Sequence, residues 1–173
     1  MPFDPGCARG MLIPTFNEPT FHCHGAEIEV DLGLGTIRVL RYAAAHDTGT
    51  IVSREGVEGQ IVGGVVQGIG QALMEMTSYD SDGQLLTGSY MDYALPRASD
   101  APMIGVVDHP VPATTNILGV KGCGEAGCAG SLTSVMNAIA DALSEFGIRH
   151  LDMPATPYRV WHAIQEARAA RTA

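Results

Sequence analysis

The chain has 173 residues, 46% of them hydrophobic, which suits one sizeable core and a single domain. Its formal charge of -9, with no lysine- or arginine-rich run, excludes the electrostatic footprint of proteins that bind nucleic acid or anionic membrane surfaces. No segment has the pattern of a signal peptide or a membrane span, and the four cysteines favour free thiols over a disulfide framework, so we expect a cytoplasmic protein.

The first part of the sequence predicts a hairpin followed by a long helix. Residues 1–25 show no clear period. Alternating apolar positions at Ile28 and Val30, a glycine-bearing turn at 32–35 and a β-branched run after it indicate a β-hairpin. Over residues 55–77 the apolar positions recur at helical spacing, which predicts a long helix.

The later elements complete an α+β pattern. The segment 80–100 has an Asp-Gly turn followed by an aromatic, β-prone stretch, and residues 103–110 form a short apolar run that ends at a proline; both are predicted members of the sheet. An apolar stripe predicts a helix over 131–146, which Gly147 ends, and Thr-Pro at 156–157 begins the last helix. The predicted fold class is α+β, a mixed sheet with packed helices.

The predicted helix at 55–77 has a neutral polar face. Each glycine in a helix interior costs about 1 kcal/mol relative to alanine, so the glycines here need a compensating role. At about 100° per residue, the aliphatic positions gather on one side, and the other side carries Gln60, Gln67, Gln71, Gly56, Gly63 and Gly64. Such a face suits close approach of a backbone or of a polar ligand that needs both donors and acceptors. The alternative is tight helix-on-sheet packing, with the glutamines bonded to neighbouring backbone.

The stretch 119–130, GVKGCGEAGCAG, is a glycine-rich loop before a predicted helix. Its Gly-x-Gly-x-x-Gly pattern matches the dinucleotide fingerprint, but the preceding strand and the later acidic residue of a Rossmann site are missing. We expect instead that backbone N–H groups near a helix N-terminus bind an anionic or oxo-bearing ligand. Glu125 would then lie in the site, where partial desolvation suits a general base; the alternative is an acid stabilised by the helix dipole.

Two patterns of cysteine and histidine residues could each indicate a metal site. Cys123 and Cys128 have the first spacing of an iron–sulfur motif, but no further cysteine follows at the required place. His22, Cys23 and His24 are zinc-ligand types, yet in an extended segment the two histidines share a face that the cysteine does not, and no companion pair follows. Neither pattern predicts a metal site.

Several motifs occur together in a fixed order, namely AEIEVD, GTIRVLRY, HDTG, VEGQIVGGVVQGIGQAL, GQLLTGSYMDYALPRASD, NILGVKGCGEAG and DMPATPYRVWHAI. In order and spacing they resemble the C-terminal part of the molybdenum-hydroxylase large subunit, a family that includes xanthine dehydrogenase, aldehyde oxidase and aerobic carbon monoxide dehydrogenase. The resemblance covers roughly residues 15–165. It implies that residues 1–173 are a single partial domain, the C-terminal segment of a molybdopterin-binding subunit.

The resemblance implies roles for particular residues. Glu125 matches the glutamate that lies beside the molybdenum and acts as a general base on metal-activated water. Gln60 matches a glutamine that hydrogen-bonds the pterin. The loop that lies against the cofactor is matched by Lys121, Gly122, Cys123 and Gly124. Gln67 and Gln71 also match the family's motif, but no direct contact with the cofactor is expected of either.

The complete enzyme, by the same resemblance, oxidises an aldehyde, an N-heterocycle or a similar small molecule with water as the oxygen source. Its implied cofactor is molybdopterin cytosine dinucleotide with molybdenum, and electrons leave through iron–sulfur clusters and FAD on other chains or domains. The implied partners are the missing upstream part of the large subunit and the iron–sulfur and flavin subunits. The segment IVSRE replaces the family's Ile-Asn-Pro, which is expected to alter the turn into the glutamine helix.

The isolated chain is expected to be inactive, because most pterin contacts and the substrate funnel belong to the upstream part. A rival hypothesis is a truncated, non-catalytic relative that folds by self-association. Half a cofactor domain leaves apolar surface exposed, so a homo-oligomer is the expected form of such a module. Glu125 would then only cap a helix.

Overall fold

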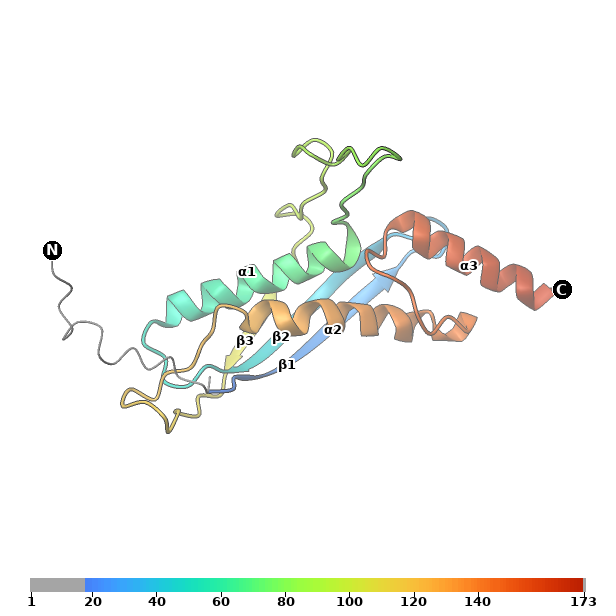
Figure 1. The fold of residues 1–173 in the computed structure, drawn as a ribbon. Helices are drawn as coiled ribbons and strands as arrows, with labels where there is room; N and C mark the ends of the chain where they lie inside the picture. Colours follow the sequence, from blue (N-terminus) through green and yellow to red (C-terminus); the bar gives the residue numbers. More distant parts are fainter. Residues whose placement is uncertain (1–17, 173) are drawn as a thin grey trace, which may run out of the picture.

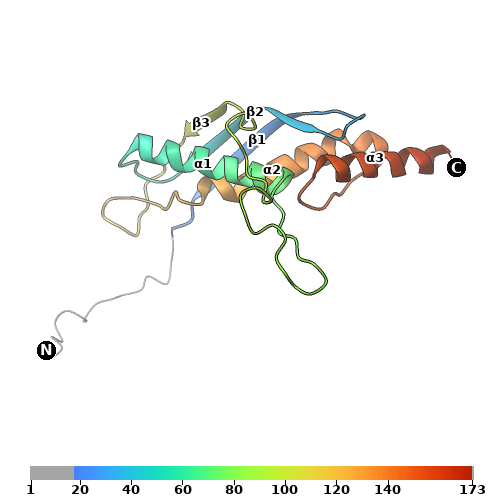
Figure 2. The same cartoon turned by 90° about the horizontal axis from the view of Figure 1, so that it is seen from above.

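A three-stranded mixed sheet forms one layer of the molecule, and helices cover one of its faces (Figure 1, Figure 2). The computed structural model describes residues 18–172. Strand β1 (Phe21–Val30) pairs antiparallel with β2 (Ile37–Asp47), and β2 pairs in parallel with β3 (Ile104–Asp108). The predicted hairpin, the strand before the proline and the α+β fold class are confirmed.

The turn of the hairpin depends on one aspartate and one glycine. Asp31 Oδ1 accepts a hydrogen bond from the backbone N–H of Gly33 (2.8 Å), which stabilises the chain reversal. Gly35 has a φ of 71°, and a Cβ there would lie 2.7 Å from the backbone N of Trp161. Only glycine fits a left-handed conformation in such close contact with another backbone.

The covered face of the sheet and the helices share one hydrophobic core. Helix α1 (Arg54–Leu73) and helix α2 (Ala126–Ala142) lie side by side on this face, and the short helix η1 (Ser144–Phe146) and helix α3 (Pro157–Thr172) follow. None of the helices in the described part of the chain is long and apolar enough to cross a membrane. The buried core residues are Tyr42, Ala44, Val57, Ile61, Val65, Ile69, Ala72, Val135, Ile139, Leu143, Ala155, Val160 and Ile164.

Glycines allow α1 and α2 to approach closely. A Cβ at Gly64 would lie 2.7 Å from the backbone N of Cys128. A Cβ at Gly127 would lie 2.9 Å from the Cα of Ile61 and closer still to its carbonyl O. Both neighbours are backbone atoms, which cannot rotate aside as a side chain can. Packing therefore explains these glycines, although the partner is a second helix and not the sheet.

Three helix boundaries differ from the predicted ones. Helix α2 ends at Ala142, not at residue 146, and η1 follows it as a separate short helix. Helix α1 ends at Leu73, because the N–H groups of the next two residues both donate to the carbonyl O of Gly70 (2.9 Å each) and close the last turn. Helix α2 begins at Ala126, five positions before the predicted start. Its early start follows from the close contact of Gly127 with α1, which outweighs the weak helix propensity of glycine.

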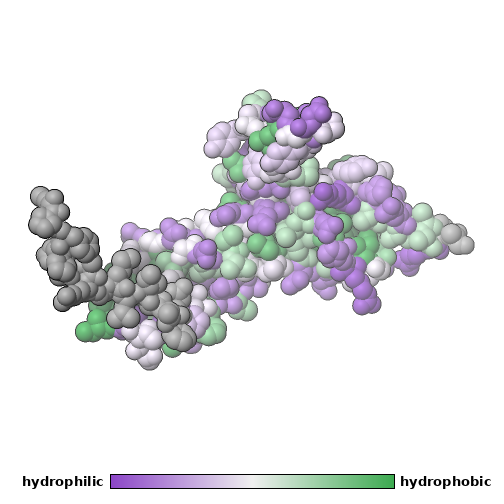
Figure 3. Space-filling view, viewed as in Figure 1, coloured by the Kyte–Doolittle hydropathy of each residue, from purple (hydrophilic) through white to green (hydrophobic). Residues whose placement is uncertain are grey.

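The predicted strand at 80–100 is wrong, because the segment after α1 forms a projecting loop (Figure 1). Asp80 Oδ1 accepts a hydrogen bond from the backbone N–H of Asp82 (2.9 Å), which favours a turn over a strand. Within the described residues its strand-like pairing is an isolated bridge between Tyr79 and Leu85. Figure 3 shows hydrophobic and hydrophilic residues mixed on this projection.

Candidate functional site

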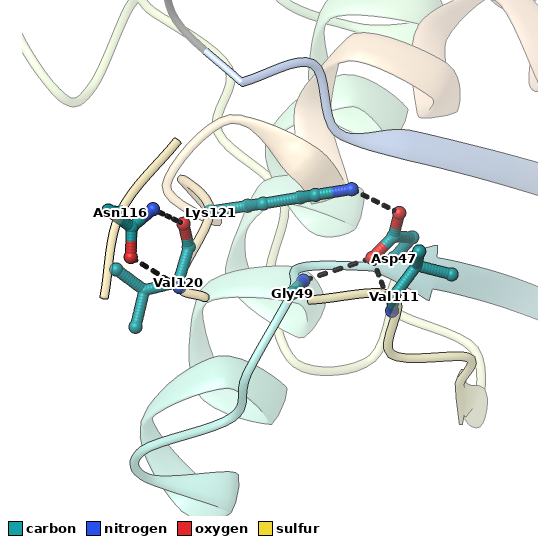
Figure 4. Close-up of polar contacts among 6 residues, drawn as sticks. All are labelled: Asp47, Gly49, Val111, Asn116, Val120 and Lys121. Atoms are coloured by element: carbon teal, nitrogen blue, oxygen red, sulfur yellow. Dashed lines mark hydrogen bonds and ion pairs between the residues drawn. The ribbon is translucent and has the colours of Figure 1, made fainter. Parts of the chain in front are cut away.

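Three segments that are distant in the sequence meet where β2 ends, at the left of Figure 1, and Asp47 joins them (Figure 4). Its Oδ1 accepts hydrogen bonds from the backbone N–H groups of Gly49 (3.0 Å) and Val111 (2.9 Å). Its Oδ2 accepts one from Lys121 Nζ (2.7 Å). The side chains of Asp47 and Lys121 are 8% and 6% exposed, so they form a buried ion pair.

Hydrogen bonding keeps Asp47 ionised. Burial by itself raises the pKa of this carboxyl, but the bonds from Lys121, Val111 and Gly49 and the lysine charge outweigh burial, so the pKa lies below its ordinary value. The Lys121 ammonium also lies 5.8 Å from the centre of the Phe21 ring. Removing either member of the pair would leave a buried charge without its partner.

Backbone hydrogen bonds tie the glycine-rich loop to the connection between β2 and α1. The N–H of Thr50 donates to the carbonyl O of Gly119 (2.9 Å), and the N–H of Lys121 donates to that of Thr48 (3.2 Å). Gly49 and Gly119 have φ values of 66° and 67°, a conformation that favours glycine. The first part of the loop is therefore fixed by both backbone and side-chain bonds.

A cavity of about 390 Å³ opens beside this junction. It brings Gln60 of α1 together with Lys121 and Cys123 of the glycine-rich loop, so three of the predicted site residues, from two distant segments, line one space. An amide and three hydroxyl groups beside three valines suit an organic ligand that has both polar and apolar parts. The other lining residues are Thr48, Thr50, Val52, Ser53, Gly56, Val57 and Val120.

Gly122 and Gly124 have no role in the packing of the described chain. Both are exposed, a Cβ at either would meet no atom within 4 Å, and neither has a positive φ. Within residues 18–172 the backbone N–H groups of residues 122–125 donate no hydrogen bond. The loop thus presents several donors with little side chain in front of them, which is the arrangement that anion binding through backbone requires.

Glu125 occupies the N-cap position of α2, but its side chain does not cap the helix. The residue has helical backbone angles (φ -104°, ψ -3°), and its carboxylate makes no capping hydrogen bond. The side chain is exposed, so the described chain does not itself supply the desolvation expected around a general base. The capping role is therefore not supported, although the charge still lies at the positive end of the helix dipole.

The glutamine stripe of α1 is exposed. The side chains of Gln60, Gln67 and Gln71 make no hydrogen bond within residues 18–172, which argues against the alternative in which they bond neighbouring backbone. A Cβ at Gly59 or Gly63 would meet no atom within 4 Å. Of the three glutamines, Gln60 lines the cavity and the other two do not.

Three histidines cluster on the sheet, and their arrangement does not suit a metal. The ring centres of His22, His24 and His46 lie between 5.1 and 6.1 Å apart, and His24 Nδ1 lies 2.8 Å from the Tyr42 hydroxyl. Burial, and then the neighbouring histidines, lower the pKa of His24 to about 4, and the pKa of His46 is lowered as well. In residues 18–172 no three His, Cys, Asp or Glu side chains are placed to hold a metal ion.

The thiols of Cys23, Cys123 and Cys128 are free, and Cys7 lies outside the described residues.

The ion pair at the junction escaped sequence reasoning, although a signal for it exists. Lys121 is the only lysine of the chain, and Asp47 follows an alanine-rich stretch and lies two positions before a glycine. A buried carboxylate needs a cation or several donors, and the lone lysine beside the glycine-rich loop is a natural partner.

Comparison with known sequences identifies relatives. A model of the molybdopterin cofactor-binding domain family matches residues 8–102. The nicotine 6-hydroxylase large subunit of Paenarthrobacter nicotinovorans is 40% identical over 142 residues, which are 82% of this chain and 17% of that protein. The carbon monoxide dehydrogenase large chain of Hydrogenophaga pseudoflava is 36% identical over 158 residues, which are 91% of this chain and 19% of that protein.

Solved structures share the fold. The Cu,Mo-CO dehydrogenase in its carbon monoxide reduced state matches with a TM-score of 0.83 at 28% identity, over 86% of this chain and 19% of that one. Quinoline 2-oxidoreductase from Pseudomonas putida 86 matches with a TM-score of 0.80 at 38% identity, over 83% of this chain and 18% of that one. The chain spans about a fifth of the length of these relatives.

Proposed function

The chain belongs to the family of molybdopterin cofactor-binding domains, and from this membership we propose that it forms part of the large subunit of a molybdenum-dependent hydroxylase. The proposed reaction is the oxidation of an aldehyde, an N-heterocycle or a similar small molecule with water as the oxygen source. Nicotine and quinoline, which appear in the names of two relatives, are N-heterocycles and favour that substrate class. Because the chain spans about a fifth of its relatives, activity requires the remainder of the subunit.

The cavity shared by Gln60 and the glycine-rich loop carries this proposal. Molybdopterin is a polar organic group with a phosphate, so its binding needs amide donors and acceptors together with donors for an anion. The Gln60 amide supplies the first; the second comes from the N–H groups of residues 122–125 at the N-terminus of α2, of which Cys123 lines the cavity. The residues present therefore fit the group.

Four loop residues complete the proposed binding set. Gly122, Cys123 and Gly124 bind through backbone N–H groups, and the two glycines admit a ligand close to the backbone because no side chain intervenes. Lys121 contributes through its place at the start of the loop, because Asp47 already holds its ammonium.

Glu125 is the proposed general base. Bound molybdenum supplies a Lewis acid that activates water and a redox centre that takes electrons from the substrate. The Glu125 carboxylate accepts the proton that is released, and its lack of a capping hydrogen bond leaves its oxygens available for that task. Its exposure in this chain suits a group that ligand and upstream residues enclose in the complete enzyme.

The proposed cofactor form is molybdopterin cytosine dinucleotide. Iron–sulfur clusters and FAD are proposed to lie on other chains or domains, since the described residues offer no cysteine set for a cluster. Relatives named as a large subunit, a large chain and a subunit gamma of a dehydrogenase complex are parts of larger enzymes, which favours iron–sulfur and flavin partners here.

A self-associating module without catalysis is the second candidate. Large apolar side chains such as Tyr90 (89% exposed), Met91 (94%) and Ile117 (101%) favour it, because a second copy of the chain would cover them. Stable oligomers of the chain alone, without cofactor in any preparation, would establish this candidate.

Molybdenum and pterin content, measured after co-expression with the remainder of the large subunit, tests the first candidate. We expect stoichiometric cofactor, which Gln60→Ala lowers and Gln67→Ala leaves unchanged, because Gln67 is exposed on the same helix but does not line the cavity. Glu125→Gln is expected to keep the cofactor and lower turnover by about 10²–10⁴-fold, the usual contribution of a general base. Glu145→Gln, at an exposed site on η1, is the control. Full activity in Glu125→Gln would reject the base.

A further inference from the structure

The glycine-rich loop runs between two fixed points. At its start, the Lys121 ammonium is held by Asp47 (2.7 Å). At its end, Gly127 lies against the backbone of Ile61 in α1, where no Cβ fits. The residues between them, 122–125, donate no hydrogen bond within the described chain. The bonds that Cys123 and Glu125 accept come from the first turn of α2, and Cys123 packs partly against the core, so the start of the loop is held chiefly at Lys121.

The fixed point at the start is built from side chains. Asp47 and Lys121 are separated by 74 positions, and the same carboxylate also binds the N–H groups of Gly49 and Val111. One buried group thus joins the connection before α1, the segment after β3 and the glycine-rich loop (Figure 4). Asn116 adds a local brace, since its Nδ2 donates to the carbonyl O of the residue before Lys121 (2.9 Å).

We propose that Asp47 is a positioning residue for the cofactor site, which acts through Lys121 to place the loop that carries Gly122, Gly124 and Glu125. The inference rests on the proposed function of that loop. Asp47 does not line the cavity, so it acts without touching the ligand. A buried ion pair adds little stability compared with apolar packing, but it penalises every arrangement in which one charge loses its partner. Such a pair therefore specifies where the loop starts.

The single lysine makes the pair directly measurable. In the unaltered chain we expect slow acetylation of Lys121 by acetic anhydride, because its side chain is 6% exposed and hydrogen-bonded. Asp47→Asn keeps an acceptor for the backbone N–H groups and removes the charge; acetylation of Lys121 and amide exchange of Thr50 should become faster by about tenfold or more. Glu29→Gln, which removes only the exposed pair with Arg38, is the control and should change neither rate.

A second variant keeps the proposal testable if Asp47→Asn does not fold. Lys121→Gln removes the other charge, and amide exchange of Thr50 then provides the rate. The double variant Asp47→Asn/Lys121→Gln restores an amide pair and is expected to recover slow exchange, together with pterin content in the complex with the remainder of the subunit. A general loss of stability would not be corrected by the second substitution in this way.

The outcomes separate the two proposals. Unchanged acetylation and exchange in Asp47→Asn would overturn the role of Asp47, as would faster rates with unchanged pterin content. Absence of pterin from the unaltered complex would reject the proposed function and with it the positioning role, while the acetylation rates would still decide whether Asp47 holds the loop. Faster rates, lower pterin content and recovery in the double variant would establish the proposal.

Discussion

Replacing Gly127 by alanine tests the closest contact between α1 and α2. The added Cβ would lie 2.9 Å from both the carbonyl C and the Cα of Ile61, and closer still to its carbonyl O. Real Cβ atoms essentially never approach other atoms within 3.0 Å, and these neighbours are backbone. One of the two helices must therefore shift, although both are held by the core beneath them.

The expected loss follows from two opposing effects. Overpacking a well-packed site costs about 1–3 kcal/mol. Alanine gains up to about 1 kcal/mol over glycine in a helix interior, but Gly127 lies in the first turn of α2, where less of that gain applies. We expect the free energy of unfolding to fall by about 1–2 kcal/mol. At roughly 2–4 °C per kcal/mol for a chain of this size, Tm should fall by about 2–8 °C.

Thermal unfolding followed by circular dichroism measures this change. Gly63→Ala is the matched control, because a Cβ there meets no atom within 4 Å and only the helix propensity changes. We expect a lower Tm for Gly127→Ala and a higher Tm for Gly63→Ala. A Gly127→Ala variant that unfolds at the temperature of the unaltered chain would refute the conclusion that the helix contact requires glycine.

Burial lowers the pKa of His24 from 6.5 to about 4, so as the pH falls the unfolded chain takes up a proton on this ring before the folded chain does. The contribution of His24 to stability is therefore complete above about pH 6.5 and is lost as the pH falls toward 4. His24→Leu should make Tm depend less on pH over this range. An unchanged dependence of Tm on pH would contradict the conclusion that His24 has a lowered pKa in the folded chain. Gly49→Ala forces alanine to a φ of 66° and places its Cβ 2.9 Å from the backbone N of Lys121. The free energy of unfolding in urea should fall by more than about 1 kcal/mol. A smaller loss would mean that the backbone around Gly49 shifts to accommodate the methyl group. Ser53→Ala removes the hydroxyl that accepts from the third residue of α1 (3.2 Å) and should cost about 1 kcal/mol in the same assay, whereas no loss would mean that water replaces the cap.

Local periodicity predicted the hairpin and the helices because it reports which side of each element is buried. It failed at 80–100, where β-prone residues have no neighbouring strand and Asp80 favours a turn. It also missed the start of α2, since Gly127 and Gly130 have the composition of a loop. Their place in a helix depends on what packs against them, which is Ile61 in one case and the ring of His24 in the other. Tertiary contacts therefore determine that both glycines are helical.

In the candidate site, too, some residues were predicted from the sequence and others were not. That Gln60 and Cys123 share a cavity agrees with the expectation from motif order, although their contact with a cofactor stays a prediction. The pairing of Asp47 with Lys121 spans 74 positions and leaves no periodic signal in either segment. Only the fold brings the end of β2 to the glycine-rich loop: the single lysine of the chain marks one member of the pair, but the structure identifies which carboxylate is its partner.

The glycines of this chain fall into two groups. At Gly64 and Gly127 another backbone occupies the space a Cβ would need, whereas at Gly63, Gly122 and Gly124 the space is open. An open glycine within a helix costs about 1 kcal/mol and gains nothing from this chain alone, so its advantage has to come from a surface that approaches from outside. Gly63→Ala should therefore stabilise the isolated chain and yet weaken its association with the remainder of the large subunit. Higher stability with unchanged association would show that the open face of α1 has no occupant.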